Sequence, residues 1–296
     1  HSADPRQMSR ELFDDCLRHA RRLGTGLVSF LGGEPLLWPH LDHAIDRCAR
    51  KHLLTDLTTN GRKLTPKRVE QLAEAGLDYL NLSVDTQSPD AVSAKNCIFR
   101  QDLLEALLDV RRRHGLHVRV NTVAYRGNLA DVSAIIERCH QNRLPLSIGL
   151  VVPPLEQRDE QDKSFLFDPE DEADLRQVVE VVLAAKQRGC QIIEPVQYFT
   201  GVFRYLRGEQ LWLCNYPRRL GWVNVTPSGR IRSCTKKMDE LETEFLRLSP
   251  TRLRELRMGF RRSTRQCNVR CYSNCAFDGA YFRRHLPQLI RRFVLR

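Results

Sequence analysis

Five cysteines crowd the last third of the sequence, where their spacing suits a metal centre: Cys214, Cys234, Cys267, Cys271 and Cys275. No secretion signal opens the chain, and in such a chain clustered cysteines indicate metal ligands before disulfides. One [4Fe–4S] cluster needs four thiolates. Zinc is the alternative, but zinc sites favour closely spaced pairs on both sides, and nineteen residues separate Cys214 from Cys234. The cysteines therefore indicate a metal site, and their spacing fits zinc poorly.

A second set of residues suits a small polar ligand, because glycine and polar residues follow successive short apolar runs. Glycines let a backbone approach a ligand closely. The carboxylate of Glu34 suits an ammonium group, and Lys95 suits a carboxylate as a point charge. The segments are Gly32-Gly33-Glu34-Pro35, Thr59-Asn60-Gly61, Ser83-Val84-Asp85, Asn121-Thr122 and Val151-Val152.

The elements that must position these segments alternate along the chain. Strands are predicted at 26–31, 54–58, 79–84, 118–123 and 146–152, with a short one at 191–194. Helices are predicted at 9–23, 41–51, 65–75, 102–113, 129–141 and 168–188, with Ser9 as an N-cap and Gly76 and Gly115 as C-caps. This order indicates βαβ units and a parallel sheet. We expect an α/β fold, a partial (β/α)6 TIM-like barrel whose working residues lie at the carboxyl ends of its strands.

A domain boundary is expected near residue 200, because the alternation of strands and helices stops there. The barrel would cover 1–200, and a small cysteine-rich α+β domain would cover 201–296. Residues 222–232 alternate on both sides of Pro227-Ser228-Gly229, which predicts a β-hairpin. The remainder is expected to form short helices and cysteine loops.

The positive charge of the chain is concentrated at its carboxyl end. The formal net charge is +11, and residues 251–296 hold twelve arginines and two acids. The predicted last helix, 279–296, carries apolar residues on one face and arginines off it, which suits either docking on its own domain or contact with a membrane surface or lipid. Nucleic acid is an unlikely partner, because no RNA-binding motif accompanies the charge. No apolar run approaches the roughly 18–20 residues of a membrane span.

The segments GGEP, TTNG and LSVD, in this order at successive strand ends, resemble the radical S-adenosylmethionine (radical SAM) enzymes over roughly residues 9–155. The resemblance implies that the Gly32 to Glu34 segment binds the amino group of SAM, and that Lys95 binds its carboxylate. It further implies a cofactor site completed by Asn60, Ser83, Asp85, Asn121 and, against adenine, Val151.

The cluster loop of that family, CxxxCxxC, is absent from the sequence. In the family it follows the first barrel strand, just ahead of the helix expected at Ser9. Since the chain begins with His1, we expect the first strand and this loop to lie upstream, and this chain alone to be inactive. The alternative is a protein that has lost them.

The cysteine end resembles the auxiliary-cluster domains called SPASM and twitch, through the spacing of Cys214, Gly229 and Cys234. The resemblance implies one auxiliary [4Fe–4S] cluster, with Cys267 as the spare thiol. Its four ligands would be Cys214, Cys234, Cys271 and Cys275. Reading CNVRCYSNC itself as the SAM-cleaving loop is disfavoured, because it follows no barrel strand.

The resemblance predicts a cytoplasmic radical SAM enzyme. It would generate a 5′-deoxyadenosyl radical that abstracts hydrogen from a peptide or small metabolite, with flavodoxin or ferredoxin as the reducing partner. One alternative is the same chemistry on a lipid at a membrane surface, which the basic last helix would serve. The other is a cluster-lacking paralogue that acts only as a binding module.

Overall fold

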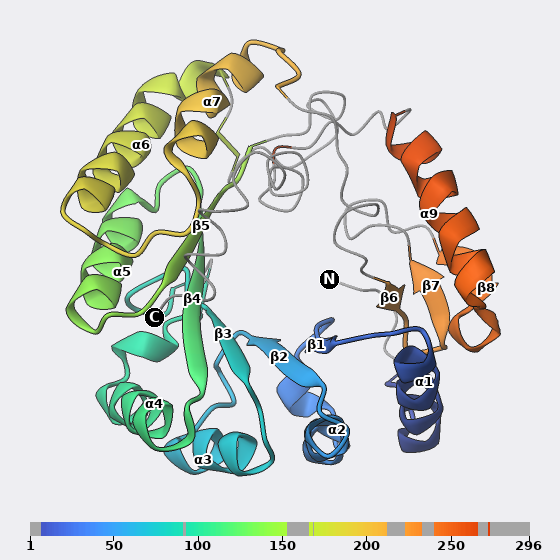
Figure 1. Ribbon diagram of the computed structural model, residues 1–296. Coiled ribbons are helices and arrows are strands. Elements are labelled where there is room, and N and C mark those ends of the chain that lie inside the picture. The colour runs from blue at the N-terminus through green and yellow to red at the C-terminus, as the bar shows by residue number, and fades with distance from the viewer. Residues whose placement is uncertain are drawn as a thin grey trace. The chain divides into compact units, whose positions relative to one another are not determined.

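Five parallel strands form the main sheet in the order β1-β2-β3-β4-β5 (Figure 1). The computed structural model describes residues 7–90, 93–152, 166–167, 169–211, 223–232, 240–265 and 272. The strands are β1 (Leu27–Phe30), β2 (Leu54–Thr59), β3 (Tyr79–Ser83), β4 (His117–Ala124) and β5 (Leu146–Leu150). With the helices between them they make an α/β fold, a partial TIM-like barrel, as the sequence predicts.

Helices connect the strands and cover one face of the sheet (Figure 1). The connecting helices are α2 (Leu41–Ala49), α3 (Pro66–Glu74), α4 (Gln101–His114) and α5 (Leu129–Gln141). The helix α1 (Arg10–Arg22) precedes β1, and α6 (Glu172–Gln187) and α7 (Val196–Leu206) follow β5. The covered face is apolar, since Leu57, Leu80 and Val120 are fully buried. Burial of this face is the main stabilising contribution to such a sheet.

The predicted signals at the helix ends are confirmed. The Ser9 hydroxyl accepts a hydrogen bond from the Leu12 backbone N–H at 3.2 Å, which satisfies one free donor of α1. Gly76 and Gly115 follow α3 and α4 with φ of +95° and +71°, the left-handed conformation that glycine adopts without a steric penalty.

The chain divides into two compact units, and the division falls inside β4. The first unit comprises His1–Asn121 and Val223–Arg254, and the second comprises Thr122–Trp222 and Glu255–Arg296. The prediction of separate domains at 1–200 and 201–296 rests on composition and stays a prediction.

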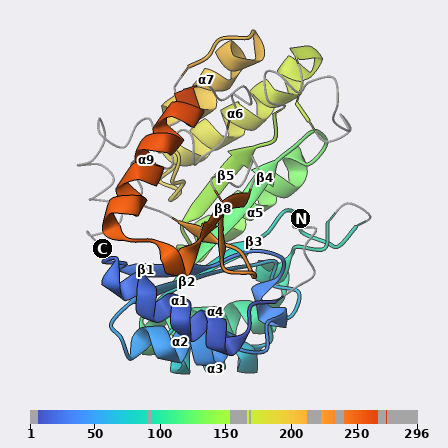
Figure 2. The same cartoon turned by 90° about the vertical axis from the view of Figure 1, so that its right-hand side faces the viewer.

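In the first unit, α1 packs beside α2 and β1 (Figure 2). An aromatic group joins them, with the Phe13 and Trp38 ring centroids 5.5 Å apart and Phe30 at 6.1 Å from Phe13. A small antiparallel sheet of β6 (Asn224–Val225), β7 (Arg230–Arg232) and β8 (Glu240–Glu244) belongs to the same unit. It begins with the predicted hairpin, whose turn residue Gly229 has φ of +79°.

In the second unit, α5 packs on α6, and α6 packs on α7. The buried side of α7 is aromatic. Its residues Tyr198 and Phe199 are fully buried, and Tyr272 packs against Tyr198 with ring centroids 5.1 Å apart. The predicted strand at 191–194 is reduced to a single parallel bridge between Leu146 and Ile192. The carboxylate of Glu194 accepts from the Ile148 backbone N–H at 2.8 Å, which satisfies a donor that a longer strand would pair.

After residue 195, two helices are longer than the short helices expected there. One is α7, and the other is α9 (Pro250–Arg265). The predicted helix at 279–296 lies outside the described residues. None of the helices in the described part of the chain is both long enough and apolar enough to cross a membrane.

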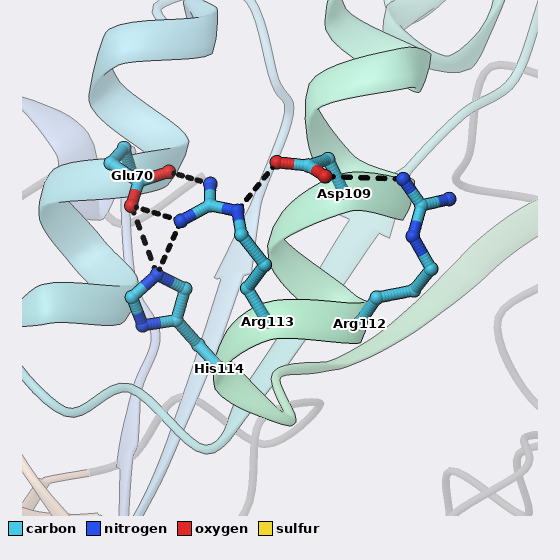
Figure 3. Close-up of polar contacts among 5 residues, drawn as sticks. All are labelled: Glu70, Asp109, Arg112, Arg113 and His114. Atoms are coloured by element: carbon cyan, nitrogen blue, oxygen red, sulfur yellow. Dashed lines mark hydrogen bonds and ion pairs between the residues drawn. The ribbon is translucent and has the colours of Figure 1, made fainter.

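An exposed network of charges joins α3 to α4 (Figure 3). Arg113 donates to the Glu70 carboxylate at 3.0 Å and to Asp109 at 2.7 Å, and His114 lies 2.9 Å from Glu70. The hydrogen bond from Arg113 is the main reason why the pKa of Glu70 falls to about 2. These contacts bridge the two helices, although exposed ion pairs add little stability.

Candidate functional site

The segment after β1 is a glycine turn closed by the Glu34 side chain. Gly32 has φ of +130°, and a Cβ placed at Gly32 or Gly33 would meet no atom of the described residues within 4 Å. The Glu34 carboxylate accepts hydrogen bonds from the Leu36 N–H at 3.1 Å, the Thr59 hydroxyl at 2.6 Å and the Asn60 N–H at 2.9 Å. One carboxylate therefore ties the end of β1 to the end of β2 and leaves the glycine backbone open.

The turn after β2 is fixed by its own side chains. The buried Thr59 hydroxyl also accepts from the Gly61 N–H at 3.1 Å, and the Asn60 side-chain oxygen accepts from the Arg62 N–H at 2.9 Å. Gly61 has φ of +70°, and a Cβ there would lie 2.6 Å from the Cβ of Cys97. Asn60 was predicted as a cofactor-site residue and Thr59 was not, although both stand in the same TTNG segment.

Beyond β3, a half-buried ion pair lies at the strand end. Lys95 Nζ lies 2.8 Å from Asp85 Oδ2, with 41% of the lysine side chain exposed and 7% of the aspartate. The Lys95 carbonyl also accepts from the Asp85 N–H at 2.9 Å. The structure thus brings together two residues that the resemblance placed on one cofactor. Their contact with a cofactor stays a prediction.

Two further candidates are neighbours at the ends of β3 and β4. Ser83 and Asn121 are partners in the parallel register, and the Asn121 carbonyl accepts from the Val84 N–H at 2.9 Å. Val151 belongs to the second unit, where its N–H donates to the Ala124 carbonyl at 2.9 Å. Its predicted place against adenine is not tested by these contacts.

A polar row, not foreseen from the sequence, crosses the uncovered face nearer the strand starts. It consists of Ser29, Asp56, Asn81 and Arg119, one from each of β1 to β4. Burial raises the pKa of Asp56, opposed by Ser29, by the charge of Arg119 and by Asn81. The signal was present as polar residues at every second position of apolar strands, a pattern that places them on the side opposite the helices.

The described cysteines are small buried core residues rather than ligands. Cys16, Cys48, Cys97, Cys139 and Cys190 are all buried, as predicted, and no disulfide joins any of them to another described residue. Burial is the main cause that raises the pKa of Cys48 and of Cys97 to about 12, which keeps these thiols protonated and unreactive. Within the ranges that the structure describes, no three His, Cys, Asp or Glu residues gather to hold a metal.

The five candidate cluster ligands, Cys214, Cys234, Cys267, Cys271 and Cys275, lie outside the described residues. The next residue after Cys271 is Tyr272, which is among the described residues and is buried against α7. Its hydroxyl donates to the Tyr198 carbonyl. Within the second unit, α7 therefore anchors the chain beside one candidate ligand.

Comparison with known proteins gives a family match over most of the first 170 residues. The profile of the Radical SAM superfamily matches residues 2–167, which is more than half of the chain. The matched range includes every segment that the sequence analysis assigned to SAM.

Solved structures share this fold. Native anSMEcpe with bound AdoMet is 16% identical with a TM-score of 0.63, over 98% of this chain and 92% of that one. SuiB of Streptococcus suis is 19% identical with a TM-score of 0.58, over 81% of this chain and 57% of that one. SuiB bound to precursor peptide SuiA is 18% identical with a TM-score of 0.57, over 87% and 62%. The chain thus spans less than two thirds of the length of SuiB.

Proposed function

The chain belongs to the radical SAM superfamily, and from this premise we propose that its strand-end site binds SAM for hydrogen abstraction from a peptide. Bound beside a reduced [4Fe–4S] cluster, SAM would supply the radical chemistry that removes a hydrogen atom from the substrate. The observation that carries the proposal is the open glycine turn at Gly32 and Gly33, held by Glu34 against the end of β2. The protein's own task is to bind and orient the reactants and to exclude water.

The residues at the site fit the charged ends of SAM. A carboxylate has about four acceptor positions, and three of those on Glu34 are used within the chain. Glu34 therefore mainly positions the turn, and the turn's backbone receives the methionine ammonium group. Lysine has three donors, so Lys95 can hold the methionine carboxylate while it keeps its contact with Asp85.

A peptide is the substrate class that the comparisons support best. One solved relative is SuiB bound to a precursor peptide, and another is anSMEcpe with bound AdoMet and the Cp18Cys peptide. At 18% and 16% identity these relatives establish the fold, and the substrate is our inference. A small metabolite is the alternative within the same chemistry, and flavodoxin or ferredoxin is the proposed reductant.

We also propose an auxiliary [4Fe–4S] cluster in this chain, held by Cys214, Cys234, Cys271 and Cys275. The core contact of Tyr272 supports it, because a rigid anchor next to Cys271 would help to fix that ligand. Such a cluster would pass on an electron or hold the substrate.

The cluster is tested by iron and sulfide analysis after anaerobic reconstitution. We expect about four irons per chain, and a loss of most of this iron in Cys271→Ala. Cys190→Ala is the matched control, because Cys190 is buried and free in the described part of the chain. Zinc without iron, or full iron content in Cys271→Ala and Cys214→Ala alike, would contradict the proposed ligands.

A further inference from the structure

The first unit has a sheet face that α2, α3 and α4 do not cover, which we call the open face. Its strand residues alternate with the buried apolar ones, since Leu57, Leu80 and Val118 lie on the helix side. On the open face, Ser83 and Asn121 are register partners, and Asn81 and Arg119 are partners two residues nearer the strand starts. Two strand residues span about 7 Å, so Asn81 and Arg119 lie one layer below the pair proposed to hold SAM. Asp56 is the register partner of Tyr79 and lies with Ser29 one layer further down.

Within the polar row, each carboxylate oxygen of Asp56 accepts one hydrogen bond from a neutral side chain. Ser29 donates to its Oδ2 at 3.0 Å, and the Asn81 side-chain amide donates to its Oδ1. Asn81 is only 4% exposed, so this chain of three side chains is fixed. Arg119 influences Asp56 through its charge without being one of these hydrogen-bond donors.

Arg119 keeps an unused donor in a buried position. Its Nε is shielded from solvent and has no hydrogen-bond partner among the residues that the structure describes. A buried donor without an acceptor is costly, and a guanidinium presents its donors in a fork that matches a carboxylate. The Nε–H of Arg119 therefore has no acceptor among the described residues, and an acceptor group on a bound ligand would satisfy it.

The neighbours of Arg119 limit what that acceptor can be. Tyr79 and His117 precede Asn81 and Arg119 by two residues, and their rings stack with centroids 4.9 Å apart. This stacked pair places aromatic carbon on the open face, one strand layer below Arg119. The negative Asp56 nearby disfavours a doubly charged phosphate more than a singly charged carboxylate.

We propose that Arg119 binds a carboxylate of the substrate on the open face, with Tyr79 and His117 beneath the apolar part of the same ligand. The proposal rests on the proposed function, which puts the reacting end of the substrate next to SAM. The proposal for Arg119 adds the class of substrate, which carries a carboxylate next to an apolar or aromatic group. Examples are an acidic residue or the carboxyl end of a peptide.

The test uses 3-phenylpropanoate as the probe and its neutral amide, 3-phenylpropanamide, as the matched ligand. Arginine side-chain Nε–H resonances of the full ¹⁵N-labelled chain are followed by NMR, and the Arg119 signal is the one lost in Arg119→Lys. We expect that signal to shift saturably with the carboxylate and not with the amide. The affinity for 3-phenylpropanoate should fall at least fivefold in Arg119→Lys, because lysine keeps the charge but lacks the paired N–H donors of the guanidinium. The affinity should be unchanged in Arg112→Gln, a variant on the exposed surface of α4.

An unshifted Arg119 signal, an equal response to the amide, or unchanged affinity in Arg119→Lys would overturn the proposal. Thermal unfolding of each variant shows whether the fold is kept, and Asn81→Leu gives a second variant that should also weaken binding. SAM binding is measured in the same samples. Normal SAM binding with no response to the carboxylate counts against this site alone, whereas absent SAM binding counts against the proposed function.

Discussion

At the scale of single residues, Glu34 positions the turn after β1 through hydrogen bonds inside the chain. Its carboxylate joins the turn after β1 to Thr59 and to the Asn60 backbone. The sequence identified Glu34 from its GGEP segment, but it could not show that the carboxylate is mostly used by neighbours. That depends on a side-chain contact between residues 25 positions apart, which no local pattern encodes.

Replacing Lys95 by methionine should weaken SAM binding about tenfold. Hydrogen bonds to charged groups contribute roughly 1.5–3 kcal/mol, and partial exposure of Lys95 puts the expected loss near the lower value. Equilibrium dialysis with radiolabelled SAM measures the change. Lys95→Arg should restore most of the affinity, and Lys67→Met, an exposed lysine on α3, should leave it unaltered. Equal affinities in Lys95→Met and the wild type would remove Lys95 from the site.

Replacing Gly61 by alanine should destabilise the fold by about 1–3 kcal/mol. The residue has φ of +70°, and the new Cβ would lie 2.6 Å from the Cβ of Cys97. Urea unfolding gives the difference in free energy. The control is Gly26→Ala, where a Cβ meets nothing within 4 Å, and its stability should stay within about 1 kcal/mol of the wild type. A Gly61→Ala chain as stable as that control would show that the turn can relax.

At the scale of elements, most of the barrel followed from its sequence pattern. The five strands and the caps at Ser9, Gly76 and Gly115 depend on local chemistry, so they were predictable. By contrast, α7 was missed because its buried residues include Tyr198, Phe199 and Val202 around Gly201, types with modest helix propensity. Packing on α6 overrides that propensity.

The α3–α4 network should stabilise the fold in a pH-dependent way. The pKa of Glu70 is lowered from 4.5 to about 2 by Arg113 and His114, so its contribution is complete above about pH 4.5 and is lost as the pH falls towards 2. In urea unfolding, Glu70→Gln should therefore be less stable than the wild type at pH 6, with a smaller difference at pH 2.5. Glu74→Gln, an exposed residue of the same helix, should show no such pH dependence. A difference that stays constant with pH would exclude the ionised carboxylate as its cause.

At the scale of the whole molecule, the chain combines a barrel of the radical SAM superfamily with a cysteine-rich carboxyl end. The polar row of Ser29, Asp56, Asn81 and Arg119 was not recognised in the sequence, because it depends on the strand pairing and on the diagonal hydrogen bond from Asn81 to Asp56. The open face then presents two functional layers in one unit. One is the proposed SAM site at the strand ends, and the other is the proposed carboxylate site below it.

The most direct test of the account is equilibrium dialysis of SAM against this chain and its Glu34→Ala variant, with Glu74→Ala as the control. The account predicts saturable binding to the wild type and to the control, and at least tenfold weaker binding to Glu34→Ala, because the turn after β1 loses its attachment to β2. No binding to the wild type, or equal binding by all three chains, would contradict the claim that the strand ends form a SAM site.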